Sequence, residues 1–516
     1  MKKDTLIIIG IILLGICMYG LTLRGAVGNP TSENITSQPT SPFESSHEKG
    51  PYGHLVSITE HGTYALTKEW ADLASPDVGT YQGRYYAFFA PGVPYLTLPF
   101  YIIGKYFGVA QLATFGTESL VSIITLVFLF LIGRRIFALP RWAAFFSVLV
   151  YGFASTSWSY AITLYQNSFT ACFMVTSFYS AWQYSQSKQR FGFLYAGYVW
   201  LAYALAISVD YPNAVLMLPV MVYLAYNIFS FKKIHEGIAL SIRWSGIFTC
   251  AIFIIVTGFH LWHNNQYYGG WSKVAGTLSN RTELSVSTQL STSQVIIATS
   301  TLSTTSPTAL VGDKSISGTF HEKLIPNGIY ILLFSDQRGL LYFTPIFIFS
   351  FLGIGYALRK KEEERAKFIV PLGFIFLNIF LYTSWGDPWG GWAYGPRYII
   401  PAMASLSLFT GIALYEVRKM FLQKILIYAA FLYSSAVALL GALTTNMVPT
   451  KGDALLLPNH ADNFLYNITF LQSNKSSSFI YNTYIKGSLT LVDYFIFIYV
   501  VIIVLTAIVI FKHHNE

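Results

Sequence analysis

The chain is poor in charged residues, and this scarcity excludes most classes of soluble protein. Only 11% of its 516 residues are Asp, Glu, Lys or Arg, while 53% are hydrophobic. Soluble domains usually carry about 25% charged residues. Several apolar runs are long enough to cross a bilayer, so the composition predicts an integral membrane protein in contact with membrane lipids. No nucleic-acid partner is expected, because the net charge of +9 comes from basic residues spread through short loops.

Cysteine is scarce as well, and its positions exclude a disulfide or zinc framework. The three cysteines, Cys17, Cys172 and Cys250, are scattered through apolar runs, where a thiol behaves as a small core side chain. His260 and His263 lie near an outer loop without a third ligand close in sequence. The sequence therefore indicates no cofactor, with a divalent metal left open as an alternative that no ligand cluster indicates.

The apolar runs predict an all-α, polytopic fold with about twelve transmembrane helices. The first run follows Lys2 and Lys3, and we expect it to be a retained helix, with a cleaved signal peptide as the alternative. The expected spans are residues 5–23, 113–133, 142–160, 166–184, 192–210, 213–231, 241–262, 339–358, 367–385, 398–416, 425–446 and 489–511.

Basic residues in the short loops predict the orientation of these spans. With twelve spans they fall on the side of Lys2 and Lys3, which the positive-inside rule makes cytoplasmic. Both termini are then cytoplasmic in the plasma membrane, and the loops 25–112, 263–338, 386–397 and 447–488 lie outside. We expect a main transmembrane unit, 1–446, followed by an outer loop and last helix, 447–516. The basic residues are Arg134, Arg135, Arg141, Lys188, Arg190, Lys232, Lys233, Arg359, Lys360, Lys361, Arg418, Lys419 and Lys512.

The first outer loop is too long to be a simple connection. Residues 45–110 are expected to form short, membrane-parallel helices on the outer ends of the spans. One of them is Val93–Phe107, which is apolar but short and interrupted by Pro94 and Pro99. The Ser- and Thr-rich stretch 272–320 is expected to be mobile.

The stretch from Trp385 to Pro401 joins two apolar runs and is the most distinctive part of the sequence. It holds four glycines and three tryptophans, so it cannot form a regular helix and lies at the membrane surface. Arg397 follows at the mouth of the next span, where a guanidinium can form a fork with a phosphate. The alternative is an aromatic turn with an arginine that snorkels to the interface.

The candidate groups for chemistry lie in the outer loops, because the inner loops are too short for a catalytic domain. Asp210, at the outer end of a span, is expected to pair with a neighbour within the protein. The outer candidates are Glu44, Glu48, Glu60, Glu69, Asp72, Asp77, Arg84, Asp336, Arg338, Asp387 and Arg397.

Several of these residues occur in motifs that resemble those of the C-type glycosyltransferase superfamily, which includes protein O-mannosyltransferases and the aminoarabinose transferases of lipid A. The order of the motifs agrees from about residue 45 to residue 405. They are His47-Glu48-Lys49-Gly50-Pro51-Tyr52 with Glu60-His61-Gly62-Thr63, then Asp77, Gly83-Arg84-Tyr85-Tyr86 and Pro91-Gly92, then Phe334-Ser335-Asp336-Gln337-Arg338-Gly339-Leu340, and Trp389-Gly390-Gly391-Trp392-Ala393-Tyr394-Gly395-Pro396-Arg397-Tyr398.

The resemblance implies transfer of a sugar from a polyprenyl-phosphate donor to an acceptor that is a protein, lipid or glycan. An inverting transfer needs a carboxylate to take the acceptor's proton and cations to hold the departing phosphate. Glu48 is the expected base, with Asp77 as the second choice. Arg338 and Arg397 are expected to hold the phosphate in one outward-facing cavity, with Arg84 third. Tyr52, Tyr85, Asp387, Trp389 and Tyr394 are expected to shape the substrate site.

One position departs from the family pattern, because His47 stands where an aspartate usually begins the first motif. Two other readings of the sequence therefore remain open. One is a protein of this fold that binds a lipid-linked sugar without transferring it. The other is a lipid or sugar transporter or flippase, although no internal repeat of the kind found in many transporters is evident.

Overall fold

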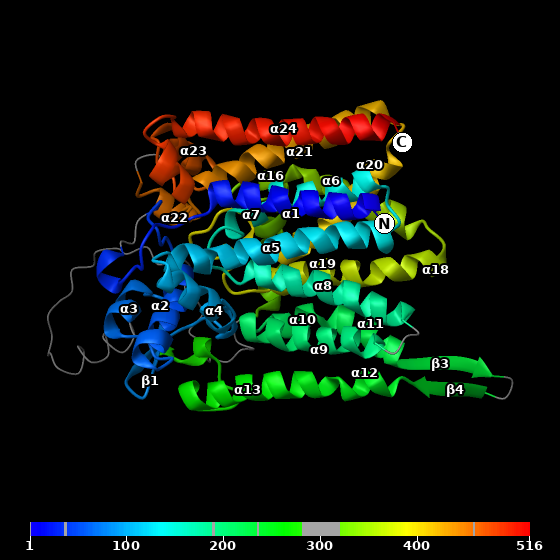
Figure 1. Ribbon diagram of the computed structural model, residues 1–516, viewed down its shortest axis with the longest axis horizontal. Coiled ribbons are helices and arrows are strands. Elements are labelled where there is room, and N and C mark those ends of the chain that lie inside the picture. The colour runs from blue at the N-terminus through cyan, green and yellow to red at the C-terminus, as the bar shows by residue number, and fades with distance from the viewer. Residues whose placement is uncertain are drawn as a thin grey trace.

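A computed structural model describes residues 2–35, 39–187, 191–234, 237–280, 320–457 and 460–515. Most of the stretch expected to be mobile, 281–319, lies outside these ranges. Long helices lie side by side along the longest axis, and both termini are at one end of the bundle (Figure 1). The segments α2, α3, α4 and β1 lie at the opposite end. The fold is therefore a polytopic helical bundle with a cap of short elements at one end.

Eight helices of the described chain are long and apolar enough to cross a membrane. Shorter apolar helices and α8 (Asn167–Gln186) occupy the remaining positions where the sequence predicts spans. The number of spans stays a prediction. The other bundle helices are α1 (Lys2–Thr22), α5 (Ala110–Arg135), α6 (Arg141–Phe153), α9 (Gly192–Val209), α11 (Leu218–Ile228), α13 (Cys250–Tyr268), α17 (Ile348–Leu358), α19 (Ile369–Thr383), α20 (Ile400–Glu416), α21 (Phe421–Leu443) and α24 (Leu491–Asn515).

Several predicted spans are broken in the structure. Span 213–231 consists of α10 (Asn213–Leu216) and α11, with Pro219 in the first turn of α11. Span 339–358 consists of α16 (Leu340–Phe343), a 3-10 turn that begins at Pro345, and α17. Proline lacks the N–H that would continue a helix and favours its first turn, which explains both breaks. The other short helices are α7 (Ser157–Tyr160), α12 (Trp244–Phe248), α15 (Ile325–Ile329), α18 (Glu362–Arg365), α22 (Lys451–Ala454) and α23 (Leu465–Gln472).

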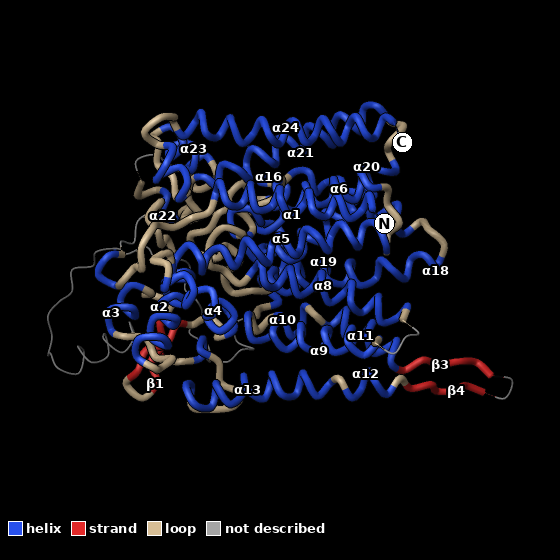
Figure 2. The backbone as a smooth tube through the Cα atoms, viewed as in Figure 1, coloured by secondary structure: helices blue, strands red, loops and turns tan. Residues whose placement is uncertain are grey.

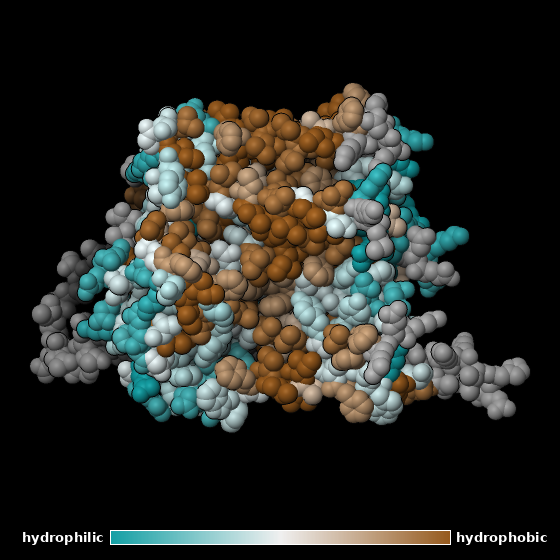
Figure 3. Space-filling model, in the orientation of Figure 1, coloured by the Kyte–Doolittle hydropathy of each residue, from teal (hydrophilic) through white to brown (hydrophobic). Residues whose placement is uncertain are grey.

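The outer surface of the bundle is apolar in its middle. Figure 3 shows hydrophobic residues gathered across the centre of one face, with hydrophilic residues at both ends. Large apolar side chains such as Ile255, Phe376 and Phe497 are exposed. Contiguous exposed apolar surface of this kind requires a non-aqueous neighbour. The molecule is therefore a multi-pass membrane protein.

Helix α20 runs through the core and is buried along almost its whole length. Glycines allow its neighbours to approach closely. A Cβ at Gly411 would lie 2.1 Å from Oγ of Ser147 on α6, and one at Gly353 of α17 would lie 1.9 Å from the carbonyl oxygen of Phe409. Close approach at small residues is the usual way that membrane helices pack. Arg397 begins the 3-10 turn that leads directly into this buried helix.

The cap contains α2 (Ser46–His61), α3 (Lys68–Leu73) and α4 (Gly92–Tyr106), together with a small sheet that the sequence analysis did not predict. Strands β1 (Val78–Tyr81) and β2 (Arg84–Ala87) form an antiparallel hairpin, and β5 (Ser279–Asn280) pairs with β1. The turn residues Gln82 and Gly83 both have positive φ, 49° and 74°, as two-residue hairpin turns require. With 15 residues, α4 is not among the helices long enough to span, as the sequence analysis expected.

A second hairpin projects from the opposite end of the bundle (Figure 2). It consists of β3 (Phe229–Ile234) and β4 (Gly237–Ile242), which pair in an antiparallel manner. The predicted span 213–231 ends inside β3, and the predicted span 241–262 begins inside β4. Both spans were therefore predicted a few residues too long at the hairpin. In sequence, Phe229 and Phe231 continue the apolar run of α11, and Ile242 lies just before the apolar run that follows β4.

Candidate active site

The cap is joined to the bundle by a buried ion pair that the sequence analysis did not identify. The Arg24 Nη1 lies 2.6 Å from Oε2 of Glu44, and each side chain is 1% exposed. The second amino group of Arg24 donates to the carbonyl of Gly441 and to Oδ1 of Asn446, at 2.8 and 3.0 Å. The Asn446 N–H donates in turn to Glu44, at 2.9 Å. This network therefore joins the end of α1, the entry to α2 and the chain after α21.

Glu48, the expected base, belongs to the same buried region. It lies in the first turn of α2, within the stretch 45–110 that was expected to form short helices. Its carboxylate accepts hydrogen bonds from the N–H of Glu44 at 2.6 Å, the N–H of Ser45 at 3.2 Å and the hydroxyl of Thr163 at 2.6 Å. The bond from Ser45 is half of a capping box. With 1% of the residue exposed, Glu48 holds the helix entry in place.

Arg338, expected to hold phosphate, donates to the protein backbone instead. It is 1% exposed, and its donors go to the carbonyl oxygens of Trp389, Gln337, Gly391, Val448 and Pro449 at 2.8–3.4 Å. Burial lowers its pKa to about 10, which leaves the guanidinium charged at neutral pH. Arg338 thus fixes the shape of the Gly-rich stretch against the chain around residue 448.

Arg397, the other expected phosphate ligand, is held differently. No carboxylate lies within ion-pair distance of it in the described ranges, and its buried Nε has no hydrogen-bond partner there. Its guanidinium lies over the rings of Tyr398 and Tyr165, at 5.2 and 5.9 Å. At 8% exposure it does not snorkel to the interface, which argues against the aromatic-turn alternative. A buried guanidinium with spare donors is suited to bind an anion.

Gly390 makes room for this guanidinium. Its φ is +69°, a left-handed conformation that favours glycine, and a Cβ there would lie 2.9 Å from Nε of Arg397. The backbone is further fixed because the Asn167 side-chain amide donates to the carbonyl of Arg397 at 2.7 Å. The glycine at position 390 therefore allows both the turn of the backbone and the close approach of the Arg397 side chain.

Asp77 and His47 face Arg397 from the cap. Asp77 directly precedes β1, is partly exposed, and accepts a hydrogen bond from the Ser46 hydroxyl at 2.5 Å. Burial raises its pKa, while the Ser46 bond and the charge of Arg397 lower it, and the net shift is upward. Burial and the same charge lower the pKa of His47, whose ring lies 4.1 Å from that of Phe89 and 5.2 Å from that of Tyr165. A partly exposed carboxylate and a neutral imidazole thus stand near a guanidinium that has no carboxylate within ion-pair distance in the described ranges.

Asp210 also lies near Arg397, whose charge acts on it. The Tyr382 hydroxyl donates to Oδ2 of Asp210 at 3.2 Å, and the Tyr382 ring stacks on Tyr398 with 4.8 Å between centroids. This bond is the pairing within the protein that we expected for Asp210. It adds a second carboxylate to the surroundings of Arg397.

The remaining predicted substrate residues make the following contacts within the protein. Tyr52 is fully buried among Phe43, Trp70 and Tyr101. Tyr394 is fully buried too, and its hydroxyl donates to the carbonyl of Val437. The other four are placed as follows: Arg84 is exposed and Tyr85 half-buried on β2, Asp387 accepts from the N–H groups of Gly390 and Gly391, and Trp389 donates to Gln337.

Sequence reasoning named Asp77 and Arg397 but missed Tyr165 and Tyr398 as their surroundings. Tyr165 lies in an irregular segment between α7 and α8, which the sequence analysis placed between two spans. The signal that could have found it is the polar run Ser-Trp-Ser-Tyr-Ala-Ile-Thr-Leu-Tyr-Gln-Asn, residues 157–167. Such a polar interruption between apolar runs indicates a non-helical segment that lies against a site.

The comparisons with known proteins concern the fold. No protein-family model and no curated protein matches the chain. Similar solved structures include ArnT from Cupriavidus metallidurans in the apo state, with 12% identity and a TM-score of 0.44 over 85% of this chain and 65% of ArnT. ArnT from the same organism bound to undecaprenyl phosphate is 14% identical, with a TM-score of 0.45 over 89% of this chain and 75% of ArnT. The oligosaccharyltransferase AglB from Archaeoglobus fulgidus, in complex with an inhibitory peptide and a dolichol-phosphate, is 12% identical. Its TM-score is 0.45 over 89% of this chain and 59% of AglB.

The chain spans 65% of the length of the apo ArnT chain and 59% of AglB. At these low identities and TM-scores the likeness assigns no reaction, and the function proposed below rests on the site itself.

Proposed function

We propose that the chain is a glycosyltransferase that moves a sugar from a polyprenyl-phosphate donor to an acceptor at the outer face of the plasma membrane. The observation that carries the proposal is Arg397, a buried guanidinium without a carboxylate partner in the described ranges, beside Asp77 and His47. Arg397 opens a candidate span, so it lies at the depth where the phosphate of a lipid donor would lie.

The transfer step assigns a role to each group. The acceptor's oxygen or nitrogen attacks the anomeric carbon of the sugar, and the bond from that carbon to the phosphate oxygen breaks. The electron pair leaves with the polyprenyl phosphate, whose growing negative charge Arg397 stabilises. The acceptor's proton passes to a carboxylate base. The step balances without a redox partner.

Asp77 is the base that the geometry favours. A base must come within about 3 Å of the acceptor's proton, directly or through one water. Asp77 is partly exposed and hydrogen-bonded only by Ser46 among the bonds described. The Glu48 carboxylate, in contrast, is buried and accepts three hydrogen bonds. His47, kept neutral near Arg397, is available to donate or accept a hydrogen bond with the sugar.

Arg397→Gln should weaken donor binding at least about tenfold, because a charge-assisted bond to phosphate is lost. The assay uses the purified full chain and a polyprenyl phosphate that carries a radiolabelled sugar. Binding and transfer of the label are measured separately. Arg84→Gln is the matched control, because this exposed arginine on β2 loses the same charge away from Arg397. Equal effects of the two substitutions would contradict the proposed role of Arg397.

The same assay separates the rival functions. A transferase releases free polyprenyl phosphate and moves the label to the acceptor fraction. A flippase in vesicles moves intact labelled donor across the bilayer, and a non-catalytic protein binds the donor without consuming it. Either of the last two results would replace the proposed reaction.

The outer position of the site can be tested by labelling introduced cysteines in intact cells. Gln82, at the exposed turn of the β1–β2 hairpin, should be labelled as cysteine by an impermeant reagent from outside. Lys361, exposed at the opposite end, should react only after the cells are permeabilised. Both are made in a background that lacks Cys17, Cys172 and Cys250. The reverse pattern would place the candidate site in the cytoplasm.

A further inference from the structure

A cavity lies between helices at the end of the bundle opposite the cap. It has a volume of about 290 Å³ and is lined by Phe137, Ala138, Leu139, Lys360, Lys367, Phe368, Ile412, Tyr415 and Glu416. The lining comes from three places in the chain: the loop after α5, the connection between α17 and α19, and the end of α20. It shares no residue with the candidate active site.

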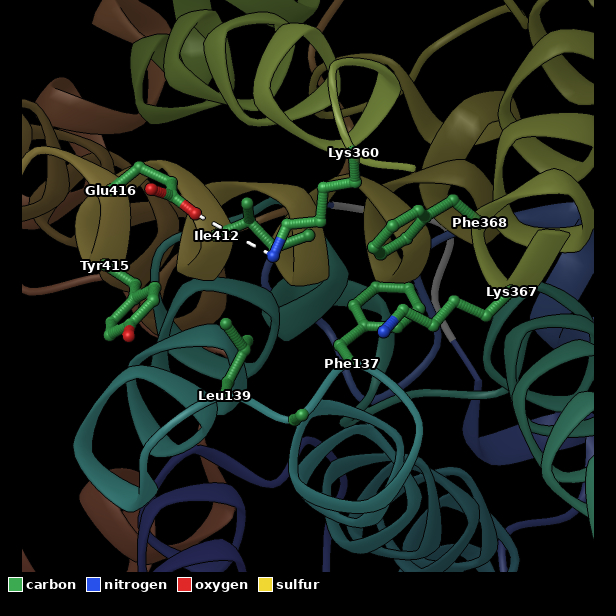
Figure 4. A pocket seen from close by; sticks show the side chains of 9 residues that line it. Phe137, Leu139, Lys360, Lys367, Phe368, Ile412, Tyr415 and Glu416 are labelled. Atoms are coloured by element: carbon green, nitrogen blue, oxygen red, sulfur yellow. Dashed lines mark ion pairs between the residues drawn. The ribbon is translucent and has the colours of Figure 1, made fainter. Parts of the chain in front are cut away.

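Two lysines, Lys360 and Lys367, are among the residues that line this cavity. Figure 4 shows the side chains of Lys360 and Lys367 reaching toward its interior. Among the lining residues named above the acid is Glu416, and its carboxylate is 3.9 Å from the Lys360 ammonium, with both side chains partly exposed. Such an ion pair contributes little and is readily exchanged for a stronger anion. Arg418 adds a third cation, because its guanidinium lies 4.2 Å from the ring centroid of Tyr415.

The rest of the lining is apolar or aromatic, and apolar surface continues outside it. Leu358, Ile369 and Phe421, each close in sequence to a lining or rim residue, are 49%, 64% and 75% exposed. Lys367 itself lies in the first turn of a candidate membrane span. A phosphate in the cavity would therefore have apolar surface beside it for acyl chains. That combination suits an amphipathic anion better than free phosphate.

We propose that this cavity binds the phosphate headgroup of an anionic membrane lipid, held by Lys360 and Lys367. Its volume is near the lower end of the range for ligand pockets, roughly 300–1,000 Å³, so it takes a headgroup while the acyl chains lie along the exposed apolar helices. Glu416 moderates the affinity by pairing with Lys360 when the site is empty. The proposal is independent of the reaction at Arg397.

The test measures lipid binding to the purified full chain in neutral detergent, with phosphatidylglycerol, phosphatidylcholine and inorganic phosphate as separate probes. Phosphatidylglycerol should bind and raise the thermal transition, and the other two should not. Lys360→Gln and Lys367→Gln should each weaken binding about fivefold, and more than tenfold together. Glu416→Gln should strengthen it. The single variants preserve the test if the double variant does not fold.

The matched control is Lys361→Gln with Lys419→Gln, which removes two exposed lysines at the same end without touching the lining. This control should keep the affinity of the unaltered chain for phosphatidylglycerol. An equal loss in the control would show that surface charge alone attracts the lipid and would overturn the proposal. Equal binding of phosphatidylcholine, or full competition by inorganic phosphate, would overturn it as well.

Discussion

Asp77→Asn should lower sugar transfer by a factor of about 10² or more, because the substitution removes the proposed base and keeps its shape. The side-chain oxygen of the introduced amide can still accept the hydrogen bond from Ser46, so the end of the cap should stay folded and donor binding should change little. Transfer is measured with the radiolabelled polyprenyl-phosphate donor at saturating concentration. Glu48→Gln is the comparison, because both acids were candidates from the sequence.

Glu48→Gln should act mainly on the stability of the cap, since its side chain accepts hydrogen bonds at the start of α2. If Glu48→Gln abolishes transfer in a protein of normal thermal stability while Asp77→Asn does not, Glu48 is the base after all. The pH profile gives a further check. Because the pKa of Asp77 is raised by burial, transfer should fall on acidification at a higher pH than for an ordinary aspartate. The variant Asp77→Asn should lose this limb of the profile.

Arg24→Met should destabilise the protein by about 3–5 kcal/mol, the usual effect of removing one partner from a buried ion pair. The Glu44 carboxylate would then be left charged and buried, with the backbone N–H groups of Thr40 and Asn446 as donors. The free energy of unfolding in detergent measures the change. Arg24→Met combined with Glu44→Gln should recover part of the loss, because no unpaired charge remains.

Lys105→Met is the control for Arg24→Met. Lys105 lies 2.8 Å from Glu60 in an ion pair whose side chains are 37% and 42% exposed, and an exposed pair is worth at most about 1 kcal/mol. A loss in Arg24→Met no larger than in Lys105→Met would mean that the buried network does not hold the cap to the bundle.

The bundle followed from the sequence because spanning helices need only length and apolar composition, as α5, α21 and α24 illustrate. The contacts of the site residues could not be predicted from composition in this way. Arg338 and Arg397 occur beside similar glycine-rich sequence, and only the fold reveals that carbonyl oxygens surround the first and none pairs with the second. Backbone partners of this kind depend on segments far apart in the chain, such as residues 389 and 448, which sequence spacing does not reveal.

Two local signals were nevertheless present in the sequence. Ser45 and Glu48 have the spacing of a capping box, which indicates that Glu48 lies inside a helix. Gln82-Gly83 lies between aromatic and β-branched residues, a pattern typical of a hairpin. Together these patterns place Glu48 inside a helix and Asp77 directly before the hairpin, which favours Asp77 as the more accessible of the two acids.

The buried contacts of Arg24 and Glu44 also bear on the order in which the protein is made. Their partners Gly441 and Asn446 lie 417 and 402 residues further along the chain. At roughly 5–20 residues per second, the ribosome needs about 20–80 s to add that length. During this interval Arg24 and Glu44 lack the hydrogen bonds that Gly441 and Asn446 later supply. The network can therefore form only after the chain has been made through the end of α21 and Asn446.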